Sequence, residues 1–143
     1  MTNWVVDASV AAKWCLPAEN ESFQPQALDL VDAFGRGEVQ LSVPDLFWAE
    51  LANVMWKSVR GGRISATEAN AALASVERLQ IPTVSCARLM SSGLAIALKH
   101  GRSLYDCIYV ALAVQASAQL ITADERLANA LAAHFPVKWL GSL

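Results

Sequence analysis

The chain has 143 residues, of which 55% are hydrophobic and 17% are charged, with a formal net charge of −2 at pH 7. This length is typical of one domain, and we expect residues 1–143 to form a single domain. The net charge excludes a polycation, so a nucleic acid would have to bind a local basic patch. The apolar fraction is high for a monomer, and we expect a partner or a second copy to cover part of the surface.

The cysteines and the amino terminus indicate a cellular compartment. Cys15, Cys86 and Cys107 are odd in number and widely spaced, which argues against both a disulfide framework and a zinc site. No basic region precedes the first apolar run, and the longest apolar run, 107–114, is too short to cross a bilayer. We therefore expect a soluble, cytoplasmic protein.

Short apolar runs alternate with amphipathic segments along the chain. The pattern predicts strands at 4–6, 39–43, 81–84, 119–122 and 137–140. It predicts helices at 8–15, 26–34, 45–59, 65–79, 87–100, 103–117 and 125–133. Strands that alternate with helices favour an α/β sandwich with a mainly parallel sheet.

Four acidic residues stand where an ionised carboxylate needs a partner. Asp7 and Asp124 follow predicted strands. Asp106 begins a predicted helix, and Glu50 interrupts the apolar stripe of another. Each aspartate has an alternative explanation as a helix-capping residue. For Glu50 the alternative is a salt bridge to Lys57.

The four acids gain significance as a set. If the strands that precede Asp7 and Asp124 are neighbours, all four carboxylates can meet in one cleft, where they would repel one another without a cation. A ligand set of carboxylates favours Mg²⁺ or Mn²⁺ over zinc, and metal-assisted phosphodiester hydrolysis is the corresponding chemistry. The hydroxyls of Ser9 and Thr122 each lie two residues from an acid and are candidates to orient it, although helix capping explains Thr122 equally well.

Four segments of the sequence, in this order, resemble the acidic motifs of the PIN-domain family. They are residues 5–9 (VVDAS), 44–54 (PDLFWAELANV), 103–113 (SLYDCIYVALA) and 120–127 (LITADERL). Each motif is weak alone, whereas the ordered set is specific and covers essentially the whole chain. The size is similar to that of the VapC-type toxins of toxin–antitoxin pairs.

The resemblance implies a PIN-like α/β/α sandwich around a five-stranded parallel sheet. It implies an Mg²⁺- or Mn²⁺-dependent endoribonuclease that leaves a 5′-phosphate and a 3′-hydroxyl. It further implies a homodimer that a VapB-type antitoxin inhibits. The metal-binding and catalytic residues carried over from the family are Asp7, Glu50, Asp106 and Asp124, with Ser9 and Thr122 supporting them.

Two basic clusters are candidates for contact with RNA phosphates. Lys57, Arg60 and Arg63 follow the Glu50 helix, and Lys99 and Arg102 precede Asp106. The alternative is that they are solvated residues that favour helix carboxyl ends. Two other functions stay open: a PIN-like nuclease that is not a toxin, and a catalytically silent module that binds a metal or a partner.

Overall fold

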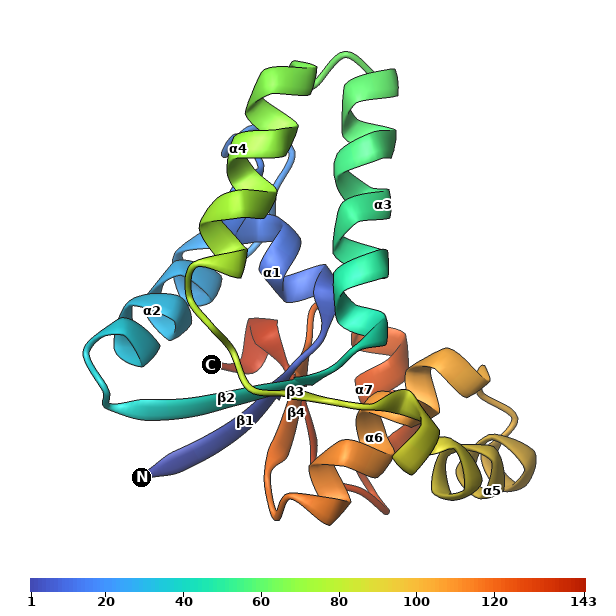
Figure 1. Cartoon of the computed structure of the whole chain (residues 1–143). Helices are drawn as coiled ribbons and strands as arrows, with labels where there is room; N and C mark the ends of the chain where they lie inside the picture. The colour runs from blue at the N-terminus through green and yellow to red at the C-terminus, as the bar shows by residue number, and fades with distance from the viewer.

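A five-stranded, entirely parallel sheet forms the centre of the computed structural model, which describes residues 1–143 (Figure 1). The strand order is β3-β2-β1-β4-β5. The strands are β1 (Thr2–Val6), β2 (Val39–Pro44), β3 (Thr83–Val84), β4 (Gln119–Thr122) and β5 (Val137–Trp139). The prediction of an α/β sandwich with a mainly parallel, five-stranded sheet is confirmed. The predicted strand at 81–84, which Pro82 disfavours, is reduced to two residues.

Apolar β-branched residues place β1 and β4 at the middle of the sheet. Val5, Val6 and Ile121 are fully buried, as expected for strands that helices cover on both faces. Val6 pairs with Ile121 at the carboxyl ends of the two strands. The residues that follow these strands therefore emerge side by side.

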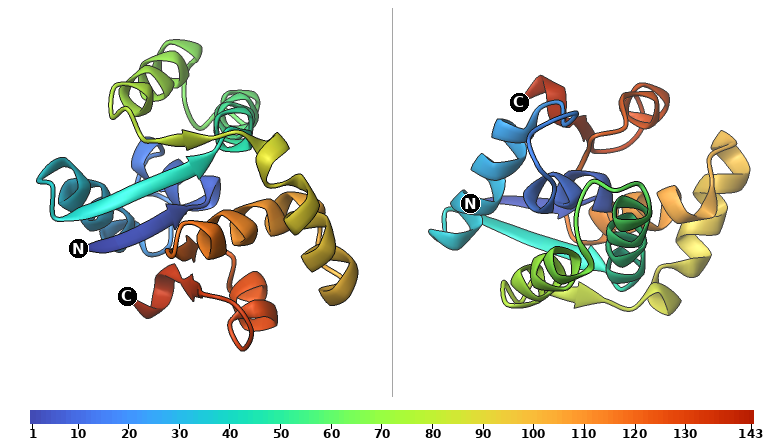
Figure 2. Two further views of the ribbon diagram at one scale, coloured as in Figure 1. Left: turned by 60° about the horizontal axis from the view of Figure 1, so that its bottom comes forward. Right: turned by 90° about the horizontal axis from the view of Figure 1, so that it is seen from above.

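Seven α-helices surround the sheet. They are α1 (Ala8–Cys15), α2 (Gln24–Gly35), α3 (Leu46–Arg60), α4 (Ala66–Glu77), α5 (Met90–His100), α6 (Leu104–Gln115) and α7 (Glu125–Leu131), with two short 3₁₀ turns at Cys86–Arg88 and Leu140–Ser142. Helices α1 and α2 cover one face, while α6 packs on the other (Figure 2). Every predicted helix and strand is present, with ends that differ by a few residues. No helix is long and apolar enough to cross a membrane.

Helices α3 and α4 extend beyond the sheet as a pair (Figure 1). The apolar stripe of α3 is buried at Phe47, Leu51 and Met55, so the base of this pair belongs to the core. Helix α4 begins with the predicted capping box, in which Ser65 accepts from the Glu68 N–H and Glu68 accepts from the Ser65 N–H. Because α3 begins two residues after β2 ends, its second turn, which carries Glu50, lies close to the carboxyl edge of the sheet.

Helix α6 is the most buried helix, and α5 packs against it from outside. A Cβ atom on Gly93 of α5 would lie 3.3 Å from Ile108 of α6, so glycine permits the close approach. The outer side of α5 leaves Leu94 and Leu98 exposed at 48% and 78%. Because α6 runs back toward the start of β4, its first turn lies at the carboxyl edge of the sheet with Asp106.

Candidate metal-dependent nuclease site

The strand order reverses between β1 and β4, and this is where parallel α/β sheets form ligand-binding crevices. Asp7 follows β1 and is the N-cap of α1, where its Oδ1 accepts from the Ser9 N–H at 3.3 Å. Asp124 follows β4 and is the N-cap of α7, accepting from the Leu127 N–H at 3.2 Å. The capping alternatives are thus correct for both residues, and capping itself fixes where each carboxylate points.

Thr122 connects the two strand ends. Its buried hydroxyl donates to Oδ2 of Asp7 at 2.8 Å and accepts from the Asp124 N–H at 3.0 Å. One side chain therefore orients one acid and holds the backbone of another, and its supporting role at a metal site stays a prediction. The alternative capping box from Thr122 to Glu125 is not formed.

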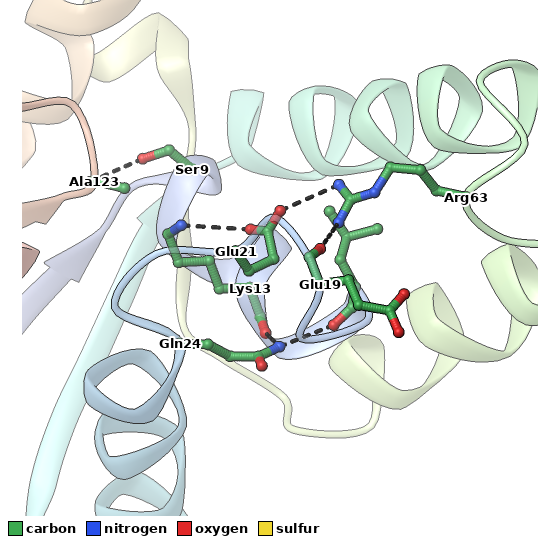
Figure 3. A network of polar contacts seen from close by, with 8 residues as sticks. Ser9, Lys13, Glu19, Glu21, Gln24, Arg63 and Ala123 are labelled. Atoms are coloured by element: carbon green, nitrogen blue, oxygen red, sulfur yellow. Dashed lines mark hydrogen bonds and ion pairs between the residues drawn. The ribbon is translucent and has the colours of Figure 1, made fainter.

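Ser9 makes a second connection between the same segments. Its hydroxyl accepts from the Ala123 N–H at 3.1 Å, and this bond joins the first turn of α1 to the loop after β4 (Figure 3). The serine thus supports the site by closing the β4–α7 loop against α1. Its own N–H donates to Asp7, so the serine contacts both segments.

Glu50 is held by a residue whose role the sequence did not predict. The hydroxyl of Tyr109, on α6, donates to Oε1 of Glu50 at 2.6 Å. Burial raises the pKa of Tyr109 far above its ordinary value, so the phenol stays protonated as a donor. The alternative salt bridge between Glu50 and Lys57 is not present. The only sequence signal for Tyr109 was its position one turn after Asp106.

Three of the acids lie close enough to affect one another. Burial raises the pKa of Asp7, the bonds from Thr122 and Ser9 oppose this shift, and the negative charge of Asp106 adds to it. Burial likewise raises the pKa of Glu50, with Tyr109 opposing and the charges of Asp7 and Asp106 adding to the rise. Burial is thus the largest cause of both raised pKa values, and repulsion among the three acids adds to it.

Asp106 lies at the third position of α6, where its N–H donates to the Ser103 hydroxyl at 3.2 Å. Its carboxylate faces Arg102 rather than solvent alone. Nη2 of Arg102 lies 3.6 Å from Oδ2 of Asp106 and 4.0 Å from Oδ2 of Asp124. The guanidinium therefore links the third acid to the fourth.

The donor atoms of the four acids decide which metal could bind them. All four side chains offer carboxylate oxygens, the hard ligands that Mg²⁺ and Mn²⁺ prefer, so the residues fit in kind. As placed, however, no three His, Cys, Asp or Glu side chains come close enough together to hold a metal ion. A shared ion would require the carboxylates to come closer together, and the four-acid metal site stays a prediction.

The basic residues predicted to contact RNA differ in their surroundings. Arg63 binds the α1–α2 loop, donating to Oε2 of Glu21 at 3.1 Å and to the Glu19 carbonyl at 2.9 Å (Figure 3). Arg60 lies over the Trp56 ring, 5.0 Å from its centroid. Lys57 and Lys99 are exposed and form no ion pair. Lys57 and Lys99 thus remain candidates for RNA contact, because no carboxylate neutralises their ammonium groups.

The comparisons with known proteins agree with the fold and with the order of the motifs. Residues 4–131 match the PIN domain family. Ribonuclease VapC3 from Pyrobaculum aerophilum is 33% identical over 127 residues, which cover 87% of this chain and 92% of the relative.

Two solved structures are similar in fold at low sequence identity. PAE2754 from Pyrobaculum aerophilum has a TM-score of 0.70 at 21% identity, covering 99% of this chain and 85% of the other. A toxin–antitoxin complex from Klebsiella pneumoniae has a TM-score of 0.60 at 16% identity, covering 94% of both chains. The family match and the identity to VapC3 establish that the chain belongs to the PIN-domain family, in the group of VapC-type ribonucleases.

Proposed function

We propose that the protein is a metal-dependent endoribonuclease that hydrolyses RNA phosphodiesters. The observation that carries the proposal is the hydroxyl of Thr122, which binds Asp7 and the backbone of Asp124 where the strand order reverses. Kinship with Ribonuclease VapC3 supports RNA as the substrate. The residues proposed for metal binding and catalysis are Asp7, Glu50, Asp106 and Asp124.

The chain's own residues would prepare the site for a cation. Thr122 and the Ser9 N–H orient the carboxylate of Asp7. Tyr109 orients that of Glu50. The chemistry that a bound Mg²⁺ or Mn²⁺ would supply is polarisation of the scissile phosphate and activation of the attacking water. Lys57 and Lys99 are proposed to bind RNA phosphates on either side of the acids.

We further propose that the protein is the toxin of a toxin–antitoxin pair, with a VapB-type antitoxin as its partner. The likeness to the Klebsiella pneumoniae toxin–antitoxin complex supports a partner of this kind. The α3–α4 pair offers an apolar groove that could bind apolar side chains of such a partner. The groove is lined by Ala52, Met55, Trp56, Val59, Ala66, Ala69, Asn70 and Leu73.

A homodimer is proposed to cover a different surface, the outer side of α5. Met90, Leu94 and Leu98 are 41%, 48% and 78% exposed and recur at helical spacing on that side. Exposed apolar residues clustered in this way mark interaction surfaces. A second copy of the chain is the proposed occupant of the α5 side.

A cleavage assay on structured RNA, with Mg²⁺ or Mn²⁺ and with EDTA, tests the enzymatic proposal. We expect the wild-type protein to cleave only with the metal, leaving 3′-hydroxyl ends. Asp7→Ala and Asp106→Asn should lose at least about 100-fold in rate, because each removes a ligand. Asp29→Asn, on the exposed side of α2, is the matched control and should cleave normally. Unchanged cleavage by both site variants would contradict the four-acid site.

A growth assay separates a toxin from a PIN-like nuclease with another role. Induced expression of the wild-type chain in its host should arrest growth, and Asp106→Asn should relieve the arrest. Co-expression of a small protein encoded beside it should relieve the arrest without any change in the chain. Normal growth despite cleavage activity in vitro would favour a nuclease that is not a toxin.

A further inference from the structure

Arg102 occupies a constrained position beside the proposed site. It lies between Gly101, which ends α5 with a left-handed φ of 68°, and Ser103, the N-cap of α6. This short connection fixes its backbone between two helix ends. Its guanidinium consequently lies over the first turn of α6 and reaches both Asp106 and Asp124.

The ion pairs of Arg102 are loose and incomplete. The Nη2–Oδ2 distances of 3.6 and 4.0 Å exceed those of well-formed charge-assisted hydrogen bonds, which are about 2.7–2.9 Å. Its Nε is buried and has no hydrogen-bond partner. Arg102 thus compensates the negative charge of the two acids without forming a fixed bidentate pair. Few hydrogen bonds hold the guanidinium in place against a competing cation.

The charge of Arg102 is permanent, because a guanidinium does not lose its proton in proteins. It faces an oxygen of Asp106 that would also be a ligand of the divalent metal. Two cations cannot both hold one carboxylate oxygen at short range without repelling each other. Arg102 and a metal therefore compete for Asp106.

We propose that Arg102 is a built-in counter-cation of the metal site, which holds Asp106 and Asp124 in the metal-free protein and which the divalent ion displaces when it binds. This inference rests on the proposed function, because it takes Asp106 and Asp124 as metal-binding residues. It assigns Arg102 to the control of metal loading rather than to the RNA contact that its sequence position suggests.

Competition has a measurable consequence for metal affinity. Breaking the Arg102 pairs is part of the free energy of metal binding in the wild-type protein, so removing the guanidinium should tighten binding. Partly exposed ion pairs are weak, and we expect Arg102→Gln to bind Mn²⁺ about 3- to 10-fold more tightly. The metal-free variant should melt at a lower temperature than the wild type, since Asp106 and Asp124 lose their counter-charge.

The test is titration of the intact protein with Mn²⁺, followed by electron paramagnetic resonance of the free ion and by the melting temperature. Arg126→Gln is the matched control, because Arg126 is exposed on α7, forms no ion pair and loses the same charge. The proposal expects tighter binding for Arg102→Gln than for Arg126→Gln. It also expects Mn²⁺ to abolish the difference in melting temperature between Arg102→Gln and the wild type.

Asp106→Asn, alone and combined with Arg102→Gln, connects the effect to the site. Loss of the affinity gain in the double variant would support competition at Asp106. Equal or weaker Mn²⁺ binding by folded Arg102→Gln, relative to Arg126→Gln, would overturn the inference. In that case Mn²⁺ binding that still depends on Asp7 and Asp106 would leave the proposed function intact, whereas no Mn²⁺ binding by any protein would remove both.

Discussion

Thr122 donates a 2.8 Å hydrogen bond from its buried hydroxyl to Oδ2 of Asp7, so a side chain on β4 fixes a carboxylate at the end of β1. The two residues are 115 positions apart in the chain, and the parallel pairing of β1 with β4 brings them together. The same hydroxyl accepts from the Asp124 N–H. The orientation of one acid and the course of the loop that carries another consequently depend on one oxygen atom.

Replacing this oxygen by a methyl group tests the dependence. Thr122→Val should lower Mn²⁺ affinity or cleavage rate by about 10- to 100-fold, as loss of a supporting partner does at metal sites. It should also lower the free energy of unfolding by about 1–3 kcal/mol, because the Asp124 N–H loses its acceptor. Urea unfolding and the RNA cleavage assay measure the two effects. Thr122→Ser keeps the hydroxyl and should retain most activity; an equal loss in both variants would contradict this role.

The raised pKa of Glu50 predicts how the metal-free protein responds to pH. Between its ordinary pKa of 4.5 and its higher pKa in the folded state, Glu50 keeps a proton in the folded state that it has released in the unfolded state. The folded state then binds more protons, so the free energy of unfolding falls as pH rises through this window. Glu50→Gln removes the ionisation while keeping an acceptor for Tyr109.

We therefore expect Glu50→Gln to be more stable than the wild type at pH 7.5 in EDTA, and the advantage to disappear near pH 4. Each kcal/mol gained in the free energy of unfolding raises the melting temperature by about 4 °C for a chain of this size. Urea unfolding across this pH range measures it. Glu77→Gln, on the exposed side of α4, is the control and should follow the wild type. If the free energy of unfolding changed with pH in the same way for the wild type and Glu50→Gln, the pKa of Glu50 would not be raised by burial.

Arg63 is predicted to act on stability rather than on RNA. Its bonds to Glu21 and to the Glu19 carbonyl attach the α1–α2 loop to the turn between α3 and α4 (Figure 3). Glu21 is only 11% exposed and also pairs with Lys13 at 3.4 Å. Arg63→Ala should lower the free energy of unfolding by about 1 kcal/mol, since it removes a hydrogen-bonded ion pair.

Arg36→Ala provides the comparison for Arg63→Ala. Arg36 also pairs with a glutamate, Glu38, but both side chains are more than half exposed, at 59% and 58%. We expect almost no change in stability, because exposed pairs contribute little. Chemical denaturation measures both variants, and RNA binding should be unchanged in each. Weaker RNA binding by folded Arg63→Ala would restore it as an RNA contact.

The outer side of α5 predicts the oligomeric state. Leu98 is 78% exposed, so Leu98→Glu should cost the monomer little stability while placing a charge in a proposed dimer interface. Light scattering should report a dimer for the wild type and a monomer for the variant. Leu28→Glu, on α2, is the control, because Leu28 is exposed at 39% away from α5. A wild-type monomer, or a dimer unaffected by Leu98→Glu, would exclude this interface.

The placement of Asp7, Glu50 and Asp124 illustrates what sequence patterns can predict. An apolar run followed by an acid predicts the strand ends at Asp7 and Asp124. An acid within the apolar stripe of a helix distinguishes Glu50. Parallel strands then bring their carboxyl ends together without further information. The pairing of β1 with β4 was a condition of the prediction, and the structure satisfies it.

Sequence patterns do not predict hydrogen-bond partners that lie far apart in the chain. The bond from Tyr109 to Glu50 depends on how α6 crosses the sheet relative to α3, and no local propensity encodes that distance. The same holds for Arg63, whose partners come from a loop about 42–44 positions away. Arg102 is predicted as a phosphate contact from its charge, and the sequence does not show that its guanidinium lies within 4.0 Å of two acids.

Lys57 and Lys99 are predicted to contact RNA phosphates because they are exposed and form no ion pair. Each phosphate contact should contribute about 0.7 to the slope of log K against log salt for single-stranded RNA. In an Asp7→Asn background that prevents cleavage, Lys57→Ala and Lys99→Ala should each reduce the slope by that amount, and the double variant by about twice as much.

Arg78→Ala is the control for these lysines. Arg78 is exposed at the end of α4 and, like the two lysines, forms no ion pair. Fluorescence anisotropy with a labelled RNA, measured at several salt concentrations, gives the slopes. We expect Arg78→Ala to keep the slope of its parent protein. A reduction equal to that of the lysine variants would mean that RNA binding follows net charge, and the two lysines would then define no RNA path across the site.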